Sequence, residues 1–209
     1  MNKITIDRKI IDKYPQFQIG VVIAEDIRND SRNSIIDFCL SESQNFVLEN
    51  TDSFNLKLWK HELDKHNIDS ADMFADSQLS KIIRGVDLVH RNSLTDICTS
   101  ITLRHCLPCV ASDFDRIDGQ LELSFKGGQA VYKDELGDIR KYLHYSISDR
   151  IKVSKDTANA LILVEILAES QIKELERAMR HLKSIFTSNF DGVVTEYILN
   201  AESAVINIG

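Results

Sequence analysis

Hydrophobic positions along the chain recur at two spacings, and the wider spacing of three to four residues predicts four helices. Two of them follow one another over residues 34–48 and 54–66. A third begins near Asn92–Ser93 and ends before Pro108, because proline cannot continue a helix. The fourth covers residues 170–186 and is amphipathic, with its apolar side chains on one face.

The second spacing is that of strands, in which apolar and polar residues alternate or apolar residues follow one another without a break. Residues 17–24 and 160–167 are nearly continuous apolar runs, which indicates buried strands. Residues 121–125 alternate, and the Gly127–Gly128 pair predicts a turn into a hairpin arm at 130–132. Further strands are expected over residues 143–153, as a pair, and over 193–199 and 204–208.

These helices and strands do not alternate strictly, which favours an α+β fold. Proline, glycine and serine form no long cluster, and the chain contains no internal repeat. We therefore expect a single domain over residues 1–209. A chain of this length can bury a sizeable core without disulfides.

Charge and hydropathy narrow the classes of function. The 25 Lys and Arg residues against 32 Asp and Glu residues give a net charge of −7, which excludes a globally basic nucleic-acid binder. We expect no DNA partner, and only a local basic patch could bind RNA. The longest mainly apolar run, 158–168, is too short to cross a membrane, so no membrane partner is expected. The first residues do not resemble a signal peptide, which favours a cytoplasmic protein with reduced cysteines.

The Cys106-Leu107-Pro108-Cys109 motif is the first candidate for chemistry. A redox dithiol needs its first sulfur at a helix N-terminus, whereas here the predicted helix ends at the pair. A zinc site needs four ligands, and the candidates would be Cys98, His105, Cys106 and Cys109. No second Cys-x-x-Cys supports such a site. We therefore expect these cysteines to be small buried hydrophobic side chains, and we expect neither a metal nor a cofactor.

Other templates of catalysis are missing from the sequence. The chain contains no Gly-x-Ser-x-Gly elbow and no glycine-rich loop that could hold a phosphate, so the corresponding hydrolase and nucleotide-binding templates fail. The 6 histidines are scattered, and His181 is expected on the exposed side of the 170–186 helix. The residue pattern taken alone leads no further than an α+β domain.

Two stretches add information because they resemble a known family. Residues 92–128 read NSLTDICTSITLRHCLPCVASDFDRIDGQLELSFKGG, and residues 148–165 read SDRIKVSKDTANALILVE. Both are similar, in order and spacing, to the tRNA-binding and editing B3/B4 domain of the phenylalanyl-tRNA synthetase β subunit, as a free-standing single-domain member. The matching positions are Asp96, Pro108, Phe114, Asp115, Gly119, Thr157, Asn159 and Glu165.

The resemblance implies a fold of mixed and antiparallel sheets packed against helices. It also implies a function, because this domain of the synthetase hydrolyses tyrosine that is wrongly attached to the phenylalanine tRNA. That reaction needs no catalytic triad, since a positioned water and the terminal ribose of the tRNA can act through orientation and electrostatics. In that domain a glutamate forms a hydrogen bond with the phenolic hydroxyl of tyrosine. A ligand without this hydroxyl binds less well, because it leaves a buried polar group unpaired.

Carried over residue by residue, the resemblance implies a substrate-binding site of four side chains. Thr99 takes the place of a pocket asparagine, and Val110 lies near the place of a pocket histidine. Glu165 is the expected hydroxyl-sensing glutamate, although an alignment without gaps puts Leu163 there. His144 is the expected substitute for a second pocket asparagine. The alternatives are that the strand frays and leaves Glu165 exposed, and that His144 has a structural role.

Three functions follow from these observations. The first is a deacylase that hydrolyses mischarged aminoacyl-tRNA in trans, with tRNA as its partner. The second is a non-catalytic module that binds an amino-acid-like ligand and has lost tRNA editing, which the acidic net charge and the apolar Val110 favour. The third is an interaction protein that uses the apolar face of the 170–186 helix, although such faces usually pack against the protein's own core. The residues leave open whether the chain is an enzyme.

Overall fold

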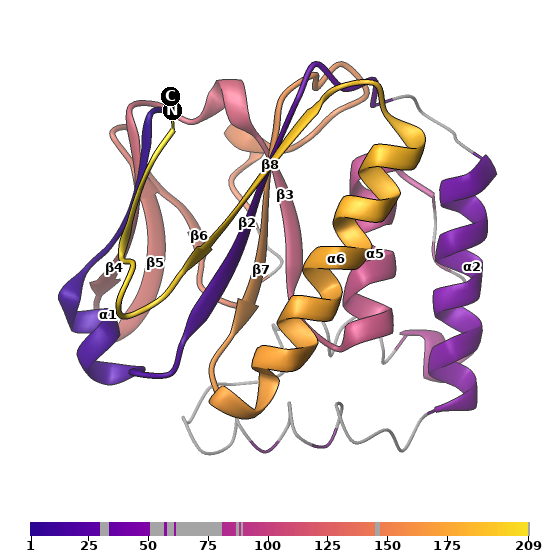
Figure 1. Cartoon of the computed structure of the whole chain (residues 1–209), viewed down its shortest axis with the longest axis horizontal. Coiled ribbons are helices and arrows are strands. Elements are labelled where there is room, and N and C mark those ends of the chain that lie inside the picture. The colour runs from indigo at the N-terminus through magenta and orange to yellow at the C-terminus, as the bar shows by residue number, and fades with distance from the viewer. Residues whose placement is uncertain are drawn as a thin grey trace.

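The computed structural model of the chain describes residues 1–29, 34–50, 57, 61, 81–86, 88, 90–144 and 147–208. These residues form an α+β fold, as the sequence predicts. Two β-sheets face each other, and three long helices lie beyond the outer face of one of them (Figure 1). The helix expected over residues 54–66 lies outside the described residues, apart from positions 57 and 61.

The four-stranded sheet is antiparallel throughout and has the order β3-β7-β2-β8. Every residue of β7 (Ala160–Ile166) is buried, because both faces of this sheet are covered. Leu163 points into the core between the two sheets, and Val164 points into the core beneath the helices. By this alternation, Glu165 faces the other sheet. The remaining strands are β2 (Gln18–Glu25), β3 (Cys109–Asp113) and β8 (Val193–Leu199).

The five-stranded sheet is mixed and has the order β6-β5-β4-β1-β9, in which β1 is parallel to β4 and the other pairs are antiparallel. The predicted hairpin of β4 and β5 is confirmed. Its turn residues Gly127 and Gly128 have φ angles of 57° and 85°, which glycine adopts without strain. The strands are β1 (Lys3–Ile6), β4 (Gln120–Lys126), β5 (Gln129–Asp134), β6 (Gly137–Lys141) and β9 (Val205–Asn207), and the short helix α1 (Arg8–Lys13) follows β1.

Helices α5 (Ser93–His105) and α6 (Ile172–Asn189) pack on the face of the four-stranded sheet that is turned away from the other sheet (Figure 1). Helix α2 (Ser34–Glu49) packs on the outside of α5. Gly20 of β2 permits the close approach of α6, because a Cβ there would lie 2.4 Å from Sδ of Met179. Single 3-10 turns are η2 (Phe114–Arg116), η3 (Asp149–Ile151) and η4 (Glu169–Gln171).

Both ends of α5 are close to the predicted positions. The N-cap is Asn92, and its Oδ1 accepts a hydrogen bond from Thr95 N at 3.0 Å. At the other end, Cys106 adopts a left-handed conformation with φ of 55°, so the helix ends before Pro108 as predicted. Among the described residues, no helix is both long and apolar enough to span a membrane.

The strand pair expected over residues 143–153 is wrong. The described part of this segment makes one isolated bridge, between Arg140 and Ile147, and then the turn η3. Leu143 has a positive φ of 66°, which turns the chain out of strand geometry. Its N–H is thereby directed at a buried carboxylate, so a tertiary hydrogen bond outweighs the local strand propensity.

Three polar side chains join α5 to α6. His105 Nδ1 lies 2.6 Å from Glu174 Oε1, and His105 Nε2 lies 3.1 Å from His181 Nδ1. The expectation that His181 is exposed is therefore wrong, because its ring is half-buried against His105. Burial lowers the pKa of His105 despite the opposing effect of Glu174. Burial, followed by the charges of His105 and Arg104, also lowers the pKa of His181.

We expect the free energy of unfolding to decrease as the pH falls below 6.5, the ordinary histidine pKa. The unfolded chain takes up protons on these histidines at their ordinary pKa, while the folded protein resists protonation, so acid favours unfolding. Urea denaturation between about pH 7.5 and 5.5 measures the effect. The variant His181→Gln should flatten this dependence. His61→Gln removes an exposed histidine and serves as the control, and equal slopes for the two variants would contradict the assignment.

Candidate functional site

The four-stranded sheet directs one buried carboxylate toward the five-stranded sheet. Glu165 is 0% exposed, so its charge needs partners inside the protein, and the alternative of a frayed, exposed strand end is overturned. The guanidinium of Arg140 in β6 donates a hydrogen bond to each carboxylate oxygen of Glu165. Tyr132 Oη donates to Oε1 at 2.5 Å, and Leu143 N donates to Oε2 at 2.8 Å. Both oxygens of Glu165 are therefore engaged by other segments of the chain.

The charge of each group follows from these contacts. Burial acts to lower the pKa of Arg140, but the neighbouring Glu165 carboxylate raises it above its ordinary value, so the guanidinium stays positive. Burial, followed by the charge of Glu165, raises the pKa of Tyr132 well above its usual range, so its hydroxyl remains a donor. The guanidinium carbon also lies 4.7 Å from the centre of the Tyr132 ring.

Strand pairing brings these side chains to the same place. The register of β5 and β6 puts Tyr132 opposite Arg140, so both side chains lie on the sheet face that meets Glu165. A shift of register follows between Tyr132 and Lys133, next to the site. After β6, Tyr142 Oη donates to Ile166 O at 2.7 Å, which ties the segment to the end of β7.

A cavity of about 740 Å³ lies beside the buried pair, at the β6 edge of the five-stranded sheet. Its wall combines the turn of the β4-β5 hairpin, strand β6 and the segment that follows β6. Lys126 Nζ lies 2.6 Å from Asp138 Oδ2, and both side chains are largely exposed. Among the described residues, no acidic side chain forms an ion pair with Lys141. The charged and titratable lining residues are Lys126, Asp138, Arg140, Lys141 and His144.

Two of the four predicted substrate-binding residues are brought together by Arg140. Its Nη1 donates to the main-chain oxygen of His144 at 2.9 Å and to Glu165 Oε2 at 3.1 Å. His144 lines the cavity, and Glu165 lies behind Arg140. Glu165 therefore acts on the cavity through Arg140, which it holds in place.

The other two predicted residues lie elsewhere. Val110 of β3 pairs with Leu163, so its side chain is on the sheet face of Glu165, but it does not line this cavity. Thr99 is on α5, which packs on the opposite face of the sheet, and its hydroxyl donates to Thr95 O at 2.8 Å. That Thr99 and Val110 contact a ligand stays a prediction.

The Cys-x-x-Cys pair does not form a surface dithiol. Cys109 is 0% exposed in β3 beside Cys98 of α5, and Cys106 is buried at the end of α5. Burial, followed by the Cys98 thiol, raises the pKa of Cys109 well above its ordinary value, which suppresses the reactive thiolate. The prediction of small buried hydrophobic side chains is confirmed for these three residues.

Comparison with known proteins yields structural similarity without a match of family or sequence. No protein-family model matches the chain, and no curated protein matches it by sequence. Among solved structures, the chain is similar to an N-terminal fragment of the phenylalanyl-tRNA synthetase β subunit from Pyrococcus horikoshii, with 11% sequence identity and a TM-score of 0.49. The similarity covers 93% of this chain and 53% of that fragment, so the chain spans about half of the fragment's length.

Sequence reasoning missed Arg140 and Tyr132. A signal for them was present, because Tyr132 lies on the predicted hairpin arm and Gly137 follows it as a second turn residue. A third antiparallel strand after this hairpin would cover residues 137–141. It would place Arg140 beside Tyr132. The choice of Glu165 as its partner required the packing of the two sheets.

Replacement of Arg140 should be strongly destabilising, because it leaves a buried carboxylate without its counter-charge. We expect Arg140→Met to lower the free energy of unfolding by about 3–5 kcal/mol in urea denaturation. Adding Glu165→Gln should recover part of the loss, since it removes the unpaired charge. Lys183→Met breaks an exposed pair with Glu196 and should cost less than about 1 kcal/mol. If Arg140→Met lowers the free energy of unfolding no more than Lys183→Met does, the role given to the buried pair is contradicted.

Proposed function

We propose that the chain binds an amino-acid-like ligand in the cavity beside Arg140 and His144. The observation that carries the proposal is the set of charges on the cavity wall, where Lys126, Lys141 and Arg140 stand with a single acid, Asp138. The volume of about 740 Å³ lies in the range of small-molecule sites. Because Glu165 neutralises Arg140 from behind and Asp138 pairs with Lys126, Lys141 carries the remaining positive charge.

This arrangement suits both ends of an amino acid. Lys141 is exposed and is the side chain best placed to bind a carboxylate. Asp138 is the only acidic side chain on the described cavity wall and can take the ammonium group. Its present pair with Lys126 is a surface pair, with side chains 44% and 68% exposed, so exchanging that partner costs little. Arg140 contributes a rigid wall, because its guanidinium is already held by Glu165.

A second candidate function is hydrolysis of an aminoacyl ester on tRNA. The supporting observation is that Lys126 and Lys141 are both exposed side chains of the cavity wall, where phosphates of an attached RNA could reach them. The resemblance of residues 92–128 and 148–165 to the B3/B4 domain points in the same direction. In this form the cavity would hold the aminoacyl group, and a positioned water would attack the ester.

Isothermal titration calorimetry with the free amino acids tests the first proposal. We expect at least one amino acid to bind, and Lys141→Gln to weaken binding about tenfold, because a hydrogen bond to a charged group contributes about 1.5–3 kcal/mol. Asp138→Asn should weaken the binding of an amino acid. It should not weaken the binding of the corresponding carboxylic acid, which lacks the amino group. Lys173→Gln changes an exposed lysine on α6 and should leave the affinity unchanged.

Two outcomes would overturn the binding proposal: no amino acid binds, or Lys141→Gln and Lys173→Gln behave alike. The second function has its own measurement, which is release of amino acids from a panel of mischarged tRNAs. Hydrolysis above the buffer rate that is lost in Lys141→Gln would support the deacylase. Binding of free amino acids without any hydrolysis would leave a binding module.

A further inference from the structure

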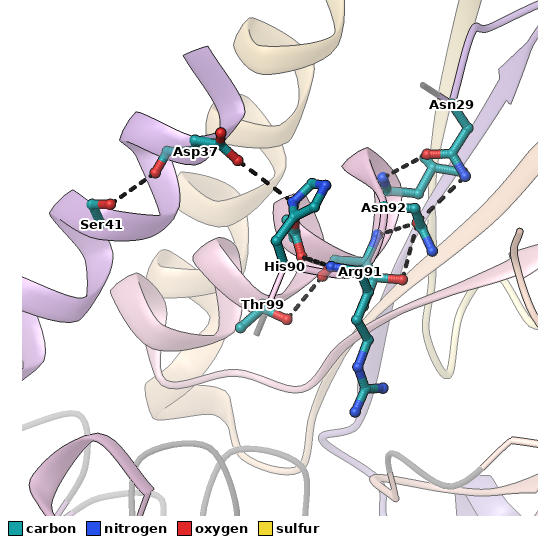
Figure 2. A network of polar contacts seen from close by, with 10 residues as sticks. Asn29, Asp37, Ser41, His90, Arg91, Asn92 and Thr99 are labelled. Carbon is teal, nitrogen blue, oxygen red and sulfur yellow. Dashed lines mark hydrogen bonds and ion pairs between the residues drawn. The ribbon is translucent and has the colours of Figure 1, made fainter. Parts of the chain in front are cut away.

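Three side chains that can bind a metal meet on the helical side of the four-stranded sheet. Asp37 comes from α2, His90 from the segment before α5, and Asp96 from the first turn of α5. One ligand atom from each lies within 4.8 Å of the others. Figure 2 shows Asp37 directed at the ring of His90, whose Nδ1 lies 3.5 Å from Asp37 Oδ1. This cluster shares no residue with the cavity wall, which belongs to the five-stranded sheet.

The positions of these side chains are fixed by a hydrogen-bond network at the start of α5. Asn92 caps the helix, and its Oδ1 also accepts a hydrogen bond from Asn29 Nδ2 at 3.3 Å (Figure 2). Asn29 Oδ1 in turn accepts from Leu94 N at 2.9 Å. Asp96 Oδ1 receives the Arg91 N–H at 3.4 Å, a weak contact that still orients the carboxylate. The first turn of α5 is therefore held before any ligand arrives.

His90 and Asp96 contribute buried polar atoms that make no hydrogen bond among the described residues. The Asp96 side chain is only 3% exposed, and its Oδ2 has no hydrogen bond among the described residues. His90 Nδ1 lies against this oxygen as an ion-pair contact, but both ring nitrogens of His90 also lack a hydrogen bond among the described residues. Buried polar atoms are usually hydrogen-bonded, so an oxygen with the ion-pair contact alone can take a further ligand.

The electrostatics favour a positively charged partner. The ligand atoms of two carboxylates and one imidazole lie within 4.8 Å of one another. A divalent cation brings positive charge to both carboxylates and gives each of the three ligand atoms a direct bond.

We propose that Asp37, His90 and Asp96 bind one divalent transition-metal ion. Two carboxylate oxygens and one imidazole nitrogen suit Zn²⁺, Co²⁺, Mn²⁺ or Fe²⁺, whereas Ca²⁺ takes more ligands, all of them oxygen. Three protein ligands leave at least one coordination position for water or another small ligand. The ion links α2 to the start of α5, in addition to the hydrogen bonds that Ser100 of α5 makes with Ser43 and with the main-chain oxygen of Cys39 in α2.

Titration of the full chain with Co²⁺ tests the site, because the visible absorption of bound Co²⁺ reports its ligands and coordination geometry. We expect one ion per chain and displacement by an equal amount of Zn²⁺. His90→Ala and Asp96→Asn should each weaken binding by more than about tenfold. The control is Asp149→Asn, which removes a carboxylate whose side chain is 92% exposed, and it should bind Co²⁺ as the wild type does.

The wild-type protein supplies a second measurement, in case the variants do not fold. Sub-stoichiometric Mn²⁺ should broaden the backbone NMR signals of Leu94 and Thr95 before those of Gly127 in the cavity wall. The proposal is overturned if the wild type binds no Co²⁺ at millimolar concentration. It is also overturned if folded His90→Ala binds Co²⁺ like the wild type, or if Mn²⁺ broadens the signal of Gly127 first.

Discussion

The buried ion pair of Glu165 and Arg140 is the interaction on which the junction of the two sheets depends. A carboxylate at this position cannot reach water, so the five-stranded sheet has to present a guanidinium and a hydroxyl to it, and the segment after β6 an N–H. Such a pair adds little net stability compared with apolar residues, but a misplaced sheet would leave several polar groups unpaired. We therefore interpret it as the contact that selects one docking of the sheets.

The contacts of this junction also shape the cavity beside Arg140. Arg140 is held by Glu165 and in turn holds the main chain of His144, so one side of the cavity is rigid before a ligand binds. The other side carries Lys126, Asp138 and Lys141, whose exposed side chains can exchange partners at low cost. A rigid wall opposite adaptable charged side chains suits a small charged ligand, because few groups lose conformational freedom when the ligand binds.

The four-stranded sheet separates two polar clusters of opposite character. Lysines and Arg140 gather on the side of the five-stranded sheet, whereas Asp37, His90 and Asp96 gather on the side of the helices. The clusters share no residue, and the apolar layers around β7 lie between them. A link between ligand binding in the cavity and metal binding at the helices would need an element with two arrangements that both sites influence.

The sequence by itself determined the α+β class, the strands around residues 17–24, 121–132 and 160–167, and the helices that became α2, α5 and α6, because periodicity depends on side chains two to four positions apart. Tertiary structure decided the rest. It replaced the strand pair expected at 143–153 by a turn, and it buried His181 against His105. It also chose partners 25 residues apart for Glu165 and 69 residues apart for His105. Such pairs arise only when separate elements pack, since nothing in the local pattern of a carboxylate or an imidazole indicates which distant group will satisfy it.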